Sequence, residues 1–476
     1  MQYFNLPRLS PAYLPLLFLG ILLLFVLFHW RAARETGFVT SARCQRCHAD
    51  HYEAWRGTLH PYPFLPVSSP DARIFGDFDT PNPLVTFKKE DIAFVMGRRW
   101  EQVYARKIDG EYYPFPAKWL IIKKKWVPFK RKDWHKTPMS YKCNGCHTTG
   151  FDPDTLGFKE FGIGCEACHG PGGLHVRNQS ERQDPLCTFC HDRLSPKPDA
   201  QDIFVSVSPS LCAQCHIRGT TAKGKVVRSE QFNFPTDFRL GKDIQRTSVA
   251  PSKPETDPQS KFWWGNGLSK NRHQEFSDWS RSEHAKSLIN LLEKAGKSLY
   301  EEKDRERVDV CLRCHSTDRR LASPDAPMDL QNARFGVTCV ACHEPHGQER
   351  WLSVSERSAA VCETCHIFQE DHPPIFCSSD AVHCVDCHMP RIGKTGGFFS
   401  LHSHAFHLVP PTETQVSGIP NSCQNGGCHA DRDLDWAITT YERLYGSAPS
   451  PPSHSTCFTE HPTKDPQLSA AQRPSS

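Results

Sequence analysis

One short motif recurs along the whole chain and constrains its fold more than any other feature. The spacing Cys-x-x-Cys occurs nine times, and histidine follows the second cysteine every time. A tenth copy, Cys423 to His429, has four residues between its cysteines instead of two. Histidine accounts for only 25 of the 476 residues, so nine chance successes are not credible and the pattern is a chemical requirement. The motifs end at His48, His147, His169, His191, His216, His315, His343, His366, His388 and His429.

This motif predicts covalent attachment of c-type haem. Residues three apart share a helix face, so two thiols reach the two vinyl groups of one porphyrin while the next side chain meets the iron. The widened copy needs a longer loop, which Gly426 and Gly427 can supply because glycine adopts otherwise costly backbone angles. We therefore expect about ten haem c groups. The attachment cysteines are Cys44, Cys47, Cys143, Cys146, Cys165, Cys168, Cys187, Cys190, Cys212, Cys215, Cys311, Cys314, Cys339, Cys342, Cys362, Cys365, Cys384, Cys387, Cys423 and Cys428.

Two alternatives compete with haem. Structural zinc sites also use Cys-x-x-Cys pairs, but they do not require histidine directly after each second cysteine. A disulfide framework suits an exported chain, although disulfide-dense proteins are usually small and their cysteine spacing carries no such histidine. Cys377 and Cys457 lie outside the motifs, and either they form one disulfide or they stay free.

Composition agrees with an interior filled by something besides side chains. Hydrophobic residues make up 38% of the chain, which is below the apolar share typical of globular domains. The 57 basic residues nearly balance the 53 acidic ones, so no nucleic-acid partner is expected.

The N-terminal region contains a long apolar run. No charged residue occurs from Leu9 to Trp30, and that length can cross a bilayer. Arg31 follows where a cleaved signal peptide would have small residues, so an uncleaved anchor is favoured over a signal peptide or a buried core helix. Because this type of haem attachment occurs outside the cytoplasm, the expected location is the cell inner membrane, single-pass, with the haem-bearing portion facing the periplasm or extracytoplasmic space.

The motif spacing indicates an internal duplication. A long gap followed by a tight cluster of four motifs occurs twice, and Phe161–Pro171 matches Phe335–Pro345. Trp55 precedes His60 by five residues, as Trp279 precedes His284. The predicted organisation is an anchor (1–35), a first multihaem module (36–246), a linker (247–261), a second module (262–446) and a disordered tail (447–476), with five motifs in each module.

The expected fold class is mainly α with extensive irregular loops and a small β-hairpin, organised around stacked haems. The hairpin is predicted over Glu101–Ala117, around an Asp109-Gly110 turn. A helix containing Leu288 and Leu291 should lead toward Cys311. The basic aromatic segment Lys118–Lys136 is a docking surface for an acidic partner, a solvated face, or a source of counter-ions for haem propionates.

The second axial ligand of each iron separates a carrier from an enzyme, because an open position admits substrate. After removal of the motif histidines and of poorly placed ones, ten histidines remain, which equals the demand of ten bis-histidine irons. Contexts that recur, or that directly follow a motif, favour four of them: His60, His175, His284 and His346. The others are His135, His273, His372, His402, His404 and His407, any of which could instead be an ordinary surface histidine.

Parts of the chain resemble a known group. Ser41 to His60, the Cys143 and Cys165 motifs and Asn421-Ser-Cys423 resemble the multihaem cytochromes c with doubled CXXCH motifs, related to the nitrifier tetrahaem cytochrome c family. That resemblance implies an extracytoplasmic electron carrier with closely stacked haems, in which His60 and His284 are distal ligands.

A second resemblance leaves an enzymatic function open. Cys384–Pro390 is similar to a segment of the pentahaem and octahaem reductases of nitrite, hydroxylamine and tetrathionate. Many nitrite-reducing members carry lysine at the catalytic haem, and no Cys-x-x-Cys-Lys occurs here.

The sequence therefore predicts a membrane-anchored decahaem cytochrome that relays electrons between a membrane or quinol-linked donor and another redox protein. The alternative is a multihaem oxidoreductase acting on a small nitrogen or sulfur compound. The expected partners are the membrane and redox proteins. No catalytic residue is assigned.

Overall fold

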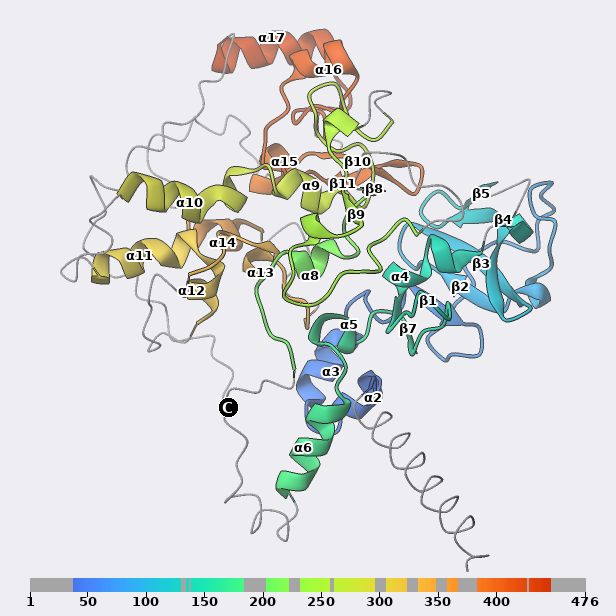
Figure 1. Cartoon of the computed structure of the whole chain (residues 1–476). Coiled ribbons are helices and arrows are strands. Elements are labelled where there is room, and N and C mark those ends of the chain that lie inside the picture. The colour runs from blue at the N-terminus through green and yellow to red at the C-terminus, as the bar shows by residue number, and fades with distance from the viewer. Residues whose placement is uncertain are drawn as a thin grey trace, which may run out of the picture.

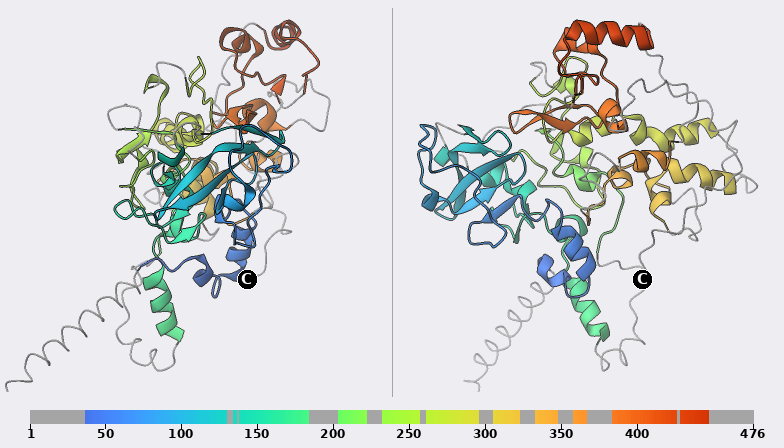
Figure 2. Two further views of the ribbon diagram at one scale, coloured as in Figure 1. Left: turned by 90° about the vertical axis from the view of Figure 1, so that its right-hand side faces the viewer. Right: turned by 180° about the vertical axis from the view of Figure 1, so that it is seen from behind.

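The structure is a computed structural model, and it describes residues 37–129, 134–136, 138–183, 203–221, 232–256, 261–295, 305–322, 333–347, 358–366, 383–425 and 428–446. A five-stranded antiparallel sheet lies at one end of the molecule, and helices α10 (Glu283–Ala295) and α11 (Arg305–His315) lie at the other (Figures 1 and 2). The middle is made of short helices, small sheets and connecting loops.

The sheet is a meander whose strand order follows the chain. The predicted hairpin is confirmed, because Asp109 and Gly110 join its two longest strands with positive φ angles of 49° and 87°. Such angles are what a two-residue hairpin turn requires. The strands are β1 (Phe64–Pro66), β2 (Phe94–Met96), β3 (Glu101–Ile108), β4 (Glu111–Leu120) and β5 (Lys125–Pro128).

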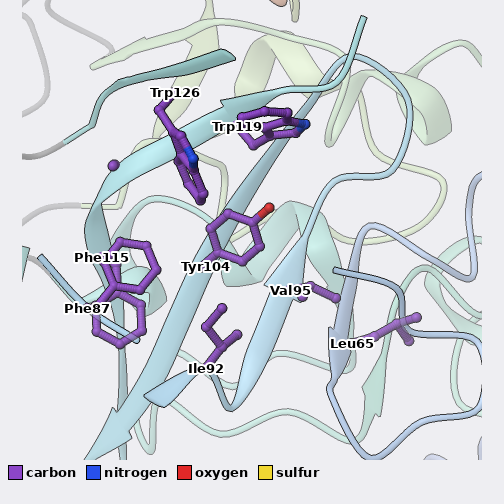
Figure 3. Packing of buried hydrophobic residues seen from close by; sticks show 9 residues of the cluster. Leu65, Phe87, Ile92, Val95, Tyr104, Phe115, Trp119 and Trp126 are labelled. Carbon is purple, nitrogen blue, oxygen red and sulfur yellow. The ribbon is translucent and has the colours of Figure 1, made fainter. Parts of the chain in front are cut away.

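Aromatic side chains cover one face of the sheet (Figure 3). Phe87 and Phe115 stack with ring centres 4.2 Å apart, and Tyr104 and Trp126 are buried beside them. Full burial of a side chain such as Phe contributes about 1.5–3 kcal/mol. The polar atoms are also satisfied, since the Gly76 amide donates to the Tyr104 hydroxyl and the Trp126 indole N–H donates to a backbone carbonyl. This sheet therefore has a core of side chains alone.

The opposite face of the sheet carries a second cluster. It consists of Phe64, Met96, Val103, Ala105 and Met139. Met139 belongs to the short helix η4 (Met139–Tyr141), which leads directly into the motif ending at His147. The sheet therefore fixes the position of one motif.

Most helices are short, and many of them are the motifs themselves. These motif helices are α2 (Ser41–Cys44), α4 (Asn144–His147), α5 (Glu166–His169), α8 (Ser210–Ala213), α11, α13 (Cys339–Cys342), α14 (Ser358–Glu363) and α15 (Cys384–His388). The other helices are α3 (Ala49–Arg56), α6 (Gly173–Gln183), α9 (Glu275–Trp279), α10, α12 (Thr317–Leu321), α16 (Pro411–Ser417) and α17 (Leu434–Tyr445). Short 3-10 turns are η2 (Lys89–Asp91), η3 (Trp134–Lys136), η5 (Ile244–Arg246) and η6 (Pro254–Thr256).

The helix predicted before Cys311 is confirmed as α10. Leu288 and Leu291 on α10 pack against Val308 and Leu312 on α11. The apolar stripe of α10 thus positions α11, which carries the motif ending at His315.

Small two-stranded sheets tie distant segments together. They are formed by β6 (Thr148–Thr149) with β7 (Glu160–Phe161), β8 (Gly219–Thr221) with β9 (Val249–Pro251), and β10 (Arg391–Thr395) with β11 (Phe398–His402). An additional parallel bridge links Asn271 to Lys394.

The expectation of a mainly α fold is wrong. The predicted hairpin is only part of a five-stranded sheet with its own aromatic core, and many helices are single turns that end with their motif. The predicted anchor (1–35) and tail (447–476) lie outside the described residues. None of the described helices is long and apolar enough to span a bilayer.

The internal duplication recurs at the level of single hydrogen bonds. The indole N–H groups of Trp55 and Trp279 donate to the carbonyls of Ile163 and Val337, at 2.9 and 2.8 Å. The amides of Ile163 and Val337 in turn donate to the carbonyls of His60 and His284. The matching tryptophans therefore hold the two candidate distal histidines against matching motifs.

A threonine hydroxyl repeats in the same way. Thr149 and Thr317 each lie two residues after a motif histidine. The Thr149 hydroxyl donates to the carbonyl of Gly162 and accepts the amide N–H of Gly164. The Thr317 hydroxyl likewise donates to the carbonyl of Gly336 and accepts the amide N–H of Thr338. Each threonine therefore links one motif to the segment that leads into the next motif.

A buried carboxylate joins the sheet to the central region. Glu101 is 9% exposed, and its carboxylate lies 2.6 Å from Lys118 on the sheet and 2.6 Å from Arg272 in the loop before α9. Burial opposes its ionisation, but the two cations hold the pKa of Glu101 below its usual range. Breaking this triad should leave two adjacent cations partly buried.

We expect Glu101→Gln to lower the free energy of unfolding by about 2 kcal/mol at pH 7, a value reduced because Arg272 is half exposed. The folded pKa is depressed, so the carboxylate's contribution is present above the unfolded value and is lost as pH falls through the folded one. Denaturant unfolding of the haem-loaded protein at pH 7 and at pH 4 measures both effects. An equal loss at the two pH values would contradict the assignment.

Candidate haem centres

The motif histidines are oriented by backbone carbonyls. Nδ1 of His169 lies 2.9 Å from the carbonyl of Phe204, Nδ1 of His315 lies 3.1 Å from that of Ser287, and Nδ1 of His147 lies 3.4 Å from that of Pro63. A carbonyl oxygen only accepts, so Nδ1 carries the proton and Nε2 keeps its lone pair. This is the tautomer that binds a metal through Nε2.

Burial keeps several of these imidazoles neutral. Burial lowers the pKa of His147 to about 4, and burial with the nearby His404 lowers that of His343 to about 4. Burial also lowers the pKa of His60 and His284 to about 4. A histidine must be neutral to bind a metal, so all four are in the ligand form at pH 7.

Histidines from distant parts of the chain face each other in pairs. Two imidazoles that bind one metal from opposite sides, with bonds of about 2 Å, have ring centres about 6 Å apart. Ring centres in four pairs lie 6.3, 5.8, 6.1 and 5.9 Å apart, each pair joining a motif histidine to a candidate distal one. In that order, the pairs are His48 with His175, His169 with His346, His343 with His404, and His366 with His284. This donor set fits haem iron with two axial imidazoles.

The remaining candidates differ in their surroundings. His60 lies near His216 and His346, and His273 lies near His147 and His216. His135 and His407 are exposed. His372, Cys187, Cys190, His191 and the glycines of the widened motif lie outside the described residues.

His402 is engaged at both ring nitrogens. Its Nδ1 contacts the carbonyl of Met389, and its Nε2 accepts a hydrogen bond from Nε of Arg391 at 3.2 Å. The carbonyl of His402 also contacts Nδ1 of His404, at 3.1 Å. This arrangement orients His404 toward His343 and leaves the ligand role of His402 a prediction.

The motifs touch one another through their cysteines. Cys44 lies beside Cys165. Cys215 lies beside Cys146, and Cys212 lies beside Cys339. The motif ending at His216 is therefore adjacent to those ending at His147 and His343.

Gln214, inside the motif ending at His216, adds direct links. Its carbonyl accepts from the thiol of Cys146 at 3.8 Å, and its side-chain amide donates to the carbonyl of Ala167 at 3.1 Å. Ala167 lies within the motif ending at His169. Three other motifs thus surround this one.

A second junction lies at the motif ending at His366. Cys365 lies beside Cys314, and Cys362 lies beside Cys384. Arg320 donates to the sulfur of Cys365 at 3.2 Å and also lies near Cys342. Eight motifs are therefore joined in one network; they end at His48, His169, His216, His147, His343, His366, His315 and His388.

Glu275, Gln214 and the two threonines are residues that the sequence reasoning missed. Nδ1 of His216 faces the Glu275 carboxylate at 3.7 Å. The His216 side chain is 51% exposed and the Glu275 side chain 24% exposed, so this contact lies at the edge of the protein interior. Only the threonines left a signal in the sequence, as the repeated pattern His-x-Thr after His147 and His315.

Two sequence families match parts of the chain. The family described as cytochrome c554 and c-prime matches residues 122–170 and 270–344, and the doubled CXXCH motif family matches residues 332–370. No curated protein matches the chain.

Two solved structures are similar. The outer cell wall cytochrome OcwA has a TM-score of 0.68 and 25% identity, over 86% of this chain and 87% of that one. The undecaheme cytochrome from the S-layer of Carboxydothermus ferrireducens has a TM-score of 0.46 and 18% identity, over 86% of this chain and 60% of that one.

The repeated motifs, the facing imidazoles and these matches define a c-type cytochrome that binds several haems and transfers electrons. More particularly, the chain is a multihaem cytochrome c with doubled CXXCH motifs, and it is similar to cytochrome c554.

The expected location in the inner membrane is corrected by these findings. The solved structure with the similar fold is that of an outer cell wall cytochrome, and no helix in the described ranges can span a membrane.

Axial pairing predicts the spectrum of a single variant. We expect His346→Ala to convert one low-spin ferric haem, bound by His169, to high spin, because it removes the facing imidazole. Electron paramagnetic resonance of the oxidised protein measures this change. His51→Ala is the matched control and should leave the spectrum as in the wild type, because the His51 ring lies 5.3 Å from that of His346 but is not a candidate axial ligand. A high-spin signal in the control, or none in His346→Ala, would show that the pairing is wrong.

Proposed function

We propose that the protein is a decahaem electron relay that works outside the cytoplasm, between a donor and another redox protein. The observation that carries this proposal is the continuous network of contacting motifs, since electrons pass most readily between closely spaced centres. The described network joins motifs from both predicted modules. A terminal enzyme needs one reactive centre, whereas a relay needs a continuous series of closely spaced redox centres.

The axial pairs support a carrier over an enzyme. An iron with two strong protein ligands is saturated and suited to electron transfer, whereas an open position admits substrate. Each facing pair supplies two imidazoles at a separation suited to one iron. We propose the remaining candidate histidines as ligands of the other irons.

Each side chain has a simple task in this relay. Haem c supplies one-electron exchange between ferric and ferrous iron when bound. The cysteines fix the cofactor covalently, and backbone carbonyls hold Nδ1 of the motif histidines so that Nε2 points to the metal. The chain itself undergoes no chemical change during transfer.

The two predicted modules interlock in this proposal. His346 belongs to the second module, yet it faces His169 of the first. Arg272 of the second likewise pairs with Glu101 of the first, at 2.6 Å. We propose that the two modules form one continuous electron-transfer chain. Location outside the cytoplasm is supported by the chemistry of covalent haem attachment and by the similar fold of the outer cell wall cytochrome.

Ten bound haems are expected per chain, including one at the widened motif. The ratio of haem to protein, from the absorbance of the pyridine derivative, should be ten in the wild type and nine in Cys423→Ala. Cys377→Ala, which lies outside every motif, is the matched control and should keep ten. A wild-type ratio of nine, unchanged in Cys423→Ala, would show that the widened motif carries no haem.

A relay should exchange electrons with a redox protein and should not turn over small compounds. We expect the fully reduced protein to be reoxidised completely by a small oxidised cytochrome c, followed by stopped-flow absorbance. Nitrite, hydroxylamine and tetrathionate should give no sustained turnover. Sustained turnover of any of the three, together with a high-spin signal in the wild type, would replace the relay with the oxidoreductase.

A further inference from the structure

The motif ending at His216 occupies a junction. Its two cysteines contact Cys146 and Cys339, and Gln214 within it bonds to Ala167. Three neighbouring motifs therefore meet at this one. If electrons follow the motif contacts, the haem at this motif determines to which of the three neighbouring motifs they pass.

Glu275 is built into the same site. It is the first residue of α9, and the amide of Phe276, which follows it, donates to the carbonyl of His216 at 3.3 Å. One oxygen of the carboxylate, Oε1, accepts the amide of His273 at 3.3 Å. The other, Oε2, is shielded from solvent, has no partner within 3.5 Å, and faces Nδ1 of His216 at 3.7 Å. The helix start thus holds a half-buried carboxylate, with its facing oxygen shielded from solvent, against the imidazole.

Other motif histidines have neutral partners in that position. His147, His169 and His315 turn Nδ1 toward backbone carbonyls. A full negative charge on Nδ1–H makes the imidazole a stronger donor to the iron than a carbonyl does. The charge also favours the ferric ion, which carries one more positive charge than the ferrous ion. Water screens this charge only in part, because the facing oxygen is shielded from solvent.

We propose that Glu275 is a positioning residue that lowers the reduction potential of the junction haem, the one bound by His216, below that of its three neighbours. An electron that reaches the junction haem from one neighbouring haem then passes quickly to another neighbouring haem and does not remain on the junction haem. The junction distributes electrons and does not store them. This inference rests on the proposed relay, but its test does not.

The test is an equilibrium redox titration of the haem-loaded protein, followed by the haem absorbance, for the wild type and Glu275→Gln. We expect one low-potential step to move to higher potential in the variant, because the amide keeps the shape of the side chain and removes its charge. The other steps should stay in place. No partner protein takes part, so a failed relay assay would leave this result standing.

Glu344→Gln is the matched control. Glu344 lies 3.5 Å from Nδ1 of His346, a candidate ligand, but its side chain is 41% exposed, against 24% for Glu275, so water screens its charge more strongly. We expect a clearly smaller shift in this variant. Superimposable curves for the wild type and Glu275→Gln, or equal shifts in the two variants, would overturn the proposal.

A third variant covers the case in which Glu275→Gln does not fold. Glu275→Asp keeps the charge but withdraws it by one methylene, and we expect a smaller upward shift of the same step. A folded aspartate variant with an unchanged titration would also overturn the proposal.

Discussion

The close approach of imidazoles from distant parts of the chain is the constraint on which the rest of this structure depends. Such a pair fixes two chain segments to within about 6 Å, however far apart they lie in the sequence. In the proposed arrangement, the metal bonds do the work that a large apolar core does elsewhere. This explains how a chain with 38% hydrophobic residues can be built from single-turn helices and loops. The sheet is the exception, because its aromatic clusters form a core without any cofactor.

Electrostatics divides the motif histidines into two groups. Three of them turn Nδ1 toward neutral backbone carbonyls, and burial keeps His147 among these three neutral. His216 instead lies against a half-buried carboxylate, at a motif with three neighbouring motifs. A change of potential at this motif therefore affects several routes. The same logic explains why Glu101 is paired with two cations, since a lone buried carboxylate would be costly.

Local patterns were predictable from the sequence, whereas long-range pairings were not. Three features depend on residues that are close in sequence, and the structure contains all three: the motifs, the turn at Asp109-Gly110 and the apolar stripe of α10. Strands β1 and β2 are only three residues long, too short for a recognisable alternation, so the sheet was underestimated and the fold was expected to be mainly α. The partner of a motif histidine depends on the finished fold. His404 faces His343 although His402 lies two residues away in the same segment, and only the contact with Arg391 distinguishes them.

The pairing of His169 with His346 has a consequence for biogenesis. Haem attachment needs only the local motif, so the cysteines before His169 can be loaded while the chain is still being exported. The opposite imidazole becomes available only after His346 has emerged. Until then only His169 would be in place to hold an iron there, and small ligands of the compartment could take the opposite side. Docking of the second half against the first would complete the pair and exclude those ligands.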